Sequence, residues 1–140
     1  MAEQPAFLAI PASSQDDIAM NTDVTILFGT EIFDQGGDFT SNTFTAPVTG
    51  RYQLSFSVRA NNIDQAAAHF LVAMVTSNRS YIDRIDPSKL SGDPATWVFN
   101  LSCLADMDAN DFAYIAVHQG AGSSQTDIAD NSYFSGFLAC

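Results

Sequence analysis

The residues best suited to chemistry in this sequence are a group of aspartates near residue 110. Asp106, Asp108 and Asp111 lie in the run Asp-Met-Asp-Ala-Asn-Asp, residues 106–111. Oxygen-bearing side chains at positions 1, 3 and 5 match the start of an EF-hand calcium loop. The sixth position holds Asp111 in place of glycine and the twelfth holds Val117 in place of glutamate, so the EF-hand interpretation fails. We interpret the run as a solvated hairpin turn and keep the three aspartates as calcium candidates.

Catalytic chemistry has few residues to work with. Nucleophilic catalysis needs a hydroxyl or thiol beside a defined base and a group that orients the base. The two histidines, His69 and His118, each adjoin an apolar run, where a structural histidine is the expected role. The sequence contains no Gly-x-Ser-x-Gly elbow, no phosphate-binding glycine loop and no His-x-x-x-His metal pair. We therefore predict a protein that is not an enzyme and needs no cofactor, with calcium left open.

The charge balance limits the classes of partner. The 140-residue chain has 5 Lys and Arg against 16 Asp and Glu, which gives a formal net charge of −11. Nucleic acid and anionic membranes are bound by clustered basic side chains, so neither is an expected partner. The 46% hydrophobic content is that of a globular chain with a real core. The length fits one domain, and we expect residues 1–140 to form it.

The start of the chain and the cysteines bear on the compartment. The first residues carry no basic region and no apolar stretch of signal-peptide length, so we expect synthesis in the host cytoplasm. Cys103 lies in an apolar strand pattern and is expected to act as a small buried hydrophobe. Cys140 is expected to be a free thiol, with a disulfide to another chain as the alternative.

The elements that must position these residues are strands, because the dominant hydrophobic period is two. Apolar and polar residues alternate over residues 52–59 and again over 96–103. Two other runs, 70–75 and 112–117, are apolar on both faces, so we expect a neighbouring subunit to cover one face of each. Gly, Pro, Asp and Asn clusters separate the runs at regular spacing. The pattern predicts an all-β antiparallel sandwich, with a jelly roll as a leading form.

Two motifs carry a family resemblance. The run Phe-Thr-Ala-Pro-Val-Thr-Gly-Arg-Tyr, residues 44–52, resembles the entry into a central strand of the complement C1q globular head, which belongs with the tumour-necrosis-factor-like jelly rolls. The run Phe-Ser-Gly-Phe-Leu, residues 134–138, resembles that family's closing strand. The residues that resemble the family's framework are Phe28, Asp34, Phe39, Phe44, Gly50, Tyr52, Leu54, Phe56, Phe134, Gly136 and Phe137.

The resemblance implies a jelly roll of about ten strands that assembles as a homotrimer, with neighbouring termini at the base and loops at the apex. Tyr114, Tyr133 and Phe134 are the candidates for packing between subunits, and an ordinary place in the core of one chain is the alternative for each. Independently of the family, we expect Gly50 to adopt a turn conformation that directs Tyr52 inward.

Three functions from different classes are compatible with such a trimer. The first is a virion surface protein, such as one of a phage, that decorates or cements a capsid, and it is our leading expectation. The alternative is a receptor- or glycan-binding head of a phage tail fibre or an adhesin, and the third is a secreted ligand-like trimer. The basic side chains gather in the middle of the chain, and we expect Arg79, Arg84 and Lys89 to mark a docking surface.

Overall fold

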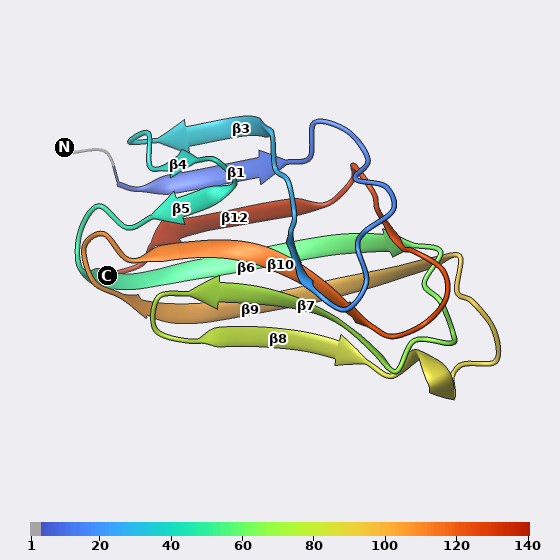
Figure 1. Cartoon of the computed structure of the whole chain (residues 1–140). Helices are drawn as coiled ribbons and strands as arrows, with labels where there is room; N and C mark the ends of the chain where they lie inside the picture. The colour runs from blue at the N-terminus through green and yellow to red at the C-terminus, as the bar shows by residue number, and fades with distance from the viewer. Residues whose placement is uncertain (1–3) are drawn as a thin grey trace.

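The computed structural model describes residues 4–140, which form two stacked antiparallel sheets (Figure 1). The strands of sheet A are β1 (Ala6–Ile10), β3 (Thr30–Gln35), β6 (Gly50–Asn61), β9 (Thr96–Met107), β11 (Asp127–Ile128) and β12 (Tyr133–Leu138). The strands of sheet B are β2 (Asp23–Thr25), β4 (Phe39–Thr40), β5 (Thr43–Thr45), β7 (His69–Thr76), β8 (Ser80–Ile85) and β10 (Phe112–Gly120). A single 3-10 turn, η1 (Pro87–Lys89), follows β8.

The strand order within each sheet is that of a jelly roll rather than a series of hairpins. Sheet A runs β3–β1–β12–β6–β9, with β11 also paired to β6, and sheet B runs β4–β5–β10–β7–β8, with β2 also paired to β10. The predicted all-β antiparallel sandwich is confirmed. The structure has twelve strands where about ten were expected, and β2 and β11 are short enough, at three and two residues, to escape a periodicity search. Within residues 4–140, no helix has the length and apolar character needed to cross a membrane.

Strand β6 is one of the two longest strands of sheet A. Its twelve residues alternate strictly, so that Tyr52, Leu54, Phe56, Val58 and Ala60 are fully buried while their neighbours face outward. β6 pairs along its whole length with β9. The phase of alternation predicted for residues 52–59 and 96–103 is therefore the one observed.

The core between the sheets is dominated by phenylalanine. The ring of Phe7 lies 4.8 Å from that of Phe44 and 5.0 Å from that of Phe39, and it meets Phe134 edge-on at 4.9 Å. Phe28 also packs against Phe134, with 5.9 Å between ring centroids. These contacts join residues from both ends of the chain, so the separated framework residues become one aromatic cluster.

Three framework positions act through the backbone. The Asp34 carboxylate accepts N–H bonds from Asp38 and Phe39 and so shapes the turn before β4. Gly136 is required by space, since a Cβ there would lie 2.4 Å from Leu54 Cδ2. We expected Gly50 to be needed for a turn conformation, and that reason was wrong. Its φ is not positive, and the residue must be glycine because a Cβ would lie 2.7 Å from the carbonyl oxygen of Cys140.

The two ends of the described chain lie side by side, as expected. Leu138 N–H donates to the Pro5 carbonyl at 3.0 Å. The loops that follow β1, β6 and β10 gather at the opposite end of the sandwich, on the right in Figure 1. The fold therefore has a base with both ends and an apex made of loops.

Candidate assembly interface

The outer face of sheet A is divided into an aromatic half and a polar half. Because β6 and its neighbours alternate, every second residue of each strand points away from the core. Over β3, β1 and β12 several of the outward residues are large and apolar. Phe33 is 49% exposed, Phe137 46% and Tyr133 39%, and Leu8 lies between Phe33 and Ser135 in register. We call Leu8, Phe33, Tyr133 and Phe137 the aromatic half.

Over β6 and β9 the same face carries hydroxyl and amide groups. The hydroxyls of Ser55 and Ser102 lie 3.0 Å apart, and the Gln53 side-chain amide donates to Ser102 Oγ at 2.6 Å. A shallow hollow of about 230 Å³ lies between this polar half and Tyr133. At the free edge of β9 the surface becomes apolar again, because Leu104 is 56% exposed and Val98 is 44% exposed.

This arrangement suits a head-to-tail contact between copies. The aromatic half lies on one side of the face and the aliphatic β9 edge on the other, so the two patches can bury each other only between different molecules. Such a heterologous contact forms a closed ring when the rotation between copies closes. Exposed phenylalanines of this size gain most from being covered, because each one buried removes a large apolar area from water.

The three predicted interface residues do not share a surface. Tyr133 lies in the aromatic half. Phe134 is fully buried in the core of its own chain, so it is not an interface residue, because successive strand residues point to opposite faces. Tyr114 points outward from sheet B, on the other side of the sandwich, where its ring stacks on Phe112 at 5.9 Å.

Sequence reasoning missed Phe33, Val98 and Leu104 as surface residues, and it counted Phe137 only as framework. For two of these residues, Phe137 and Val98, the strand alternation already indicated an outward side chain. Phe137 is three residues after the buried Phe134, and Val98 occupies the polar phase of the alternation over 96–103, so both must face outward.

Two of the three calcium candidates, Asp106 and Asp111, engage protein groups through their carboxylates. Asp106 forms an ion pair with Arg79, and its hydrogen bonds with that guanidinium hold the pKa of the carboxyl below its usual value. The Asp111 carboxylate accepts the Asp108 backbone N–H at 2.8 Å and so closes the turn before β10. Among residues 4–140, no three His, Cys, Asp or Glu side chains are grouped so as to hold a metal ion.

The three basic residues expected to form a docking surface are also dispersed. Arg79 lies in the turn before β8 and is neutralised by Asp106. Arg84 is exposed near the end of β8 and points outward from sheet B, opposite Leu71 of β7. Lys89 ends the short η1 turn, beyond both sheets. They mark three separate places on one side of the sandwich.

The apex loops are fastened by a buried carboxylate. Asp64, 4% exposed, accepts the backbone N–H groups of Ser123 and Ser124 at 2.6 and 2.8 Å and that of Ala66 at 2.9 Å. The hydrogen bond from Ser123 is the main cause that lowers the pKa of Asp64, against the opposing effect of burial. One side chain thus ties the loop after β6 to the loop after β10.

The two cysteines differ in exposure. Cys103 is half-buried in β9 with its sulfur 3.7 Å from that of Met74, and burial raises the pKa of its thiol. Cys140 is exposed. The expected role of Cys103 as a small hydrophobe fits its contact, although its burial is partial.

The sequence and the fold were compared with those of known proteins. The family model described as C1q domain matches residues 6–139. The chain belongs to the C1q domain family. The match spans both motifs that carried the resemblance and confirms it. No curated protein matches the sequence.

Solved structures show the same fold at low sequence identity. The globular domain of zebrafish complement 1qA protein is 18% identical, with a TM-score of 0.69 and 98% of each chain covered. A crystal structure of murine APRIL is 8% identical, with a TM-score of 0.66, 96% of this chain covered and 98% of that one. This C1q domain therefore shares its fold with these structures although few residues are identical. Such divergence is expected, because a fold can persist when the pattern and volume of its hydrophobic residues are preserved.

Proposed function

We propose that this C1q domain is a non-enzymatic binding protein that assembles as a homotrimer through the outer face of sheet A. The observation that carries the proposal is the aromatic half, where three large rings, each 39–49% exposed, share the outer face of sheet A around Leu8. Contiguous apolar patches of this kind mark interaction sites in soluble proteins. The opposed aliphatic edge of β9 supplies the matching surface.

Binding rather than catalysis is supported by the side chains that could do chemistry. His118 Nδ1 lies 2.8 Å from Asp23, and the aspartates near residue 110 are held by Arg79 and by their own turn. The side chains of His118, Asp106 and Asp111 thus each have a partner within the chain. Loops fastened at the apex leave a surface for recognising a ligand, as do the loops of other rigid β scaffolds.

Sedimentation equilibrium tests the assembly. One chain has a mass of 15.1 kDa, so the trimer should sediment at about three times that value. A single species at the mass of one chain, at every concentration, would overturn the proposal. A dimer would overturn it equally, because the proposal is of three copies related by a three-fold axis.

At a finer level we propose that the trimer decorates a virus particle, the expectation formed from the sequence. Immunogold electron microscopy of particles from the source tests this. Label spread over the shell supports decoration, and label confined to a tail supports the alternative, a receptor- or glycan-binding fibre head. Absence of label from all particles would overturn both and leave a free, ligand-like trimer.

A further inference from the structure

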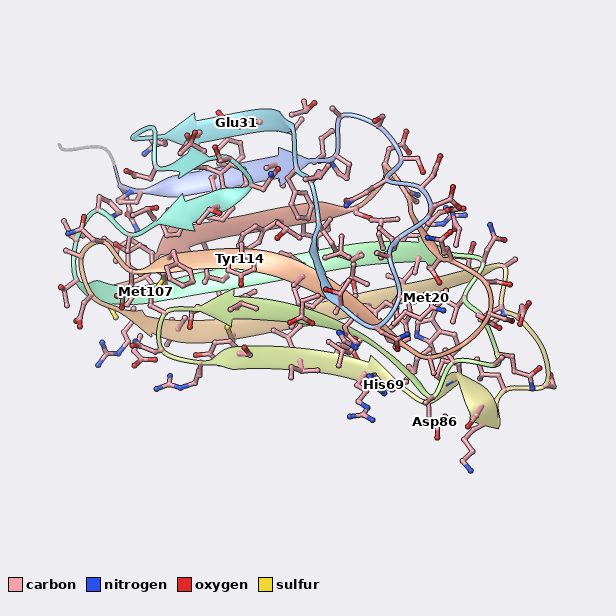
Figure 2. All side chains as sticks on the ribbon, in the orientation of Figure 1. Met20, Glu31, His69, Asp86, Met107 and Tyr114 are labelled. Atoms are coloured by element: carbon pink, nitrogen blue, oxygen red, sulfur yellow. The ribbon has the colours of Figure 1, made fainter. Side chains whose placement is uncertain are left out.

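The outer face of sheet B is a second surface that the single chain leaves uncovered. β10 and β7 are apolar on both faces, as the sequence indicated. Ile115 and Val117 point into the core, whereas Tyr114 and the two alanines Ala116 and Ala73 point outward. Figure 2 labels Tyr114 on β10 and His69 at the start of β7. The small alanines form the floor of a hollow of about 290 Å³, whose walls include Leu71, Val75 and Ile82.

The strand register arranges this face in rows that cross up to four strands. The first row is Asp23 on β2, His118 on β10, Leu71 on β7 and Arg84 on β8. The second row is Thr25, Ala116, Ala73 and Ile82 in the same strand order. A third row places Tyr114 beside Val75 and Ser80. The first row therefore begins with an acid and ends with a base.

A two-fold axis parallel to the strands, above the boundary between β10 and β7, makes these rows self-complementary. That rotation reverses the order of the strands and keeps each row opposite itself. Asp23 then lies opposite Arg84 of the second copy, and Arg84 opposite Asp23 of the second copy. In the other rows Tyr114 lies opposite Val75 of the second copy and Ile82 opposite Thr25. One isologous contact thus contains two opposite-charge pairs around an apolar centre.

Both charged groups are exposed enough to reach a second copy. Asp23 is 82% exposed in its side chain and uses one carboxylate oxygen, Oδ1, for His118. Arg84 is exposed and makes no salt bridge within residues 4–140. The alanine floor lets the two sheets approach until the side chains around the rims interdigitate, as in face-to-face sheet packing.

The size of the face sets the strength of the contact. Four strands about 4.8 Å apart and nine residues of about 3.4 Å cover at most roughly 600 Å² per copy, or roughly 1,200 Å² in total. That is the lower end of specific interfaces, so association should depend on concentration. The contact leaves sheet A free, because the two outer faces lie on opposite sides of the sandwich.

We propose that two copies of this chain pair through the outer faces of sheet B, with Asp23 of each copy bound to Arg84 of the other. The pairing does not rest on the trimer. If both contacts form, each trimer carries three pairing faces and can link to further trimers.

Charge reversal and its rescue test the pairing. Sedimentation velocity would be measured on the full chain from about 5 µM to about 500 µM, a range that spans affinities expected for so small an interface. The wild type should show mass increasing with concentration, to twice that of the species at low concentration or beyond. Arg84→Glu and Asp23→Arg, each alone, should weaken this step at least tenfold, and the double variant should restore it.

The controls separate this pairing from the trimer. The mass at low concentration reports the assembly through sheet A and should be the same in all four proteins. Lys89→Glu makes the same change of charge outside the face and should pair like the wild type. A wild type whose mass does not change with concentration would overturn the proposal, and so would a double variant that pairs no better than the single ones.

Discussion

Phe137 offers a quantitative test of the assembly through sheet A. It lies in the aromatic half, near the end of β12, and is 46% exposed in a single chain. A phenylalanine side chain presents roughly 200 Å², so about 90 Å² remains to be covered. At about 25 cal/mol per Å², its burial contributes about 2 kcal/mol per copy and about 7 kcal/mol per trimer.

Phe137→Ser should therefore lower the association constant of the trimer by roughly five orders of magnitude. Dissociation of a trimer varies with the square of concentration, so the midpoint concentration should rise roughly 300-fold. The assay is a dilution series followed by light scattering or sedimentation equilibrium. Circular dichroism should show an unchanged β spectrum, because the substituted side chain faces outward.

The matched control is Val48→Ser. Val48 is 47% exposed, almost the same as Phe137, but it lies in the loop between β5 and β6 and not on the outer face of sheet A. Val48→Ser should leave the midpoint concentration of trimer dissociation equal to that of the wild type. Equal midpoints for Phe137→Ser and Val48→Ser would refute the assignment of the interface to this face.

Three further outcomes follow from the packing and the charges, each measurable by urea denaturation. Gly136→Ala should destabilise the chain by about 1–3 kcal/mol, because the new Cβ would lie 2.4 Å from Leu54 Cδ2 and 2.9 Å from Phe7 Cε1, whereas Gly92→Ala meets nothing within 4 Å and should be neutral. Asp64→Asn should cost about 1–3 kcal/mol, because an amide cannot accept all three loop N–H groups. The pKa of Asp64 is lowered in the folded chain, so its contribution to the free energy of unfolding is complete above about pH 4. That contribution is lost as the pH falls through the lowered pKa. The stability of the Asp64→Asn variant should therefore depend less on pH over this acid range.

Much of the fold could be predicted from the sequence because β structure carries its own period. The alternation over residues 52–59 determines which side chains of β6 enter the core, whichever strands lie beside it. Five of the six framework phenylalanines that the family resemblance identified lie in the core, and the exception is Phe137. The same rule, applied to Phe134 and Phe137, would have separated a core residue from a surface one.

The tertiary structure alone decided which surfaces remain uncovered. β12 pairs with both β1 and β6, and this pairing across most of the chain places Leu8, Tyr133 and Phe137 on one face. Nothing local encodes that neighbourhood, since strand pairing depends on contacts between distant segments. The register across β2, β10, β7 and β8 likewise sets Asp23 and Arg84 in one row. The sequence by itself determined what each strand buries, and the pairing of strands decided what the molecule can bind.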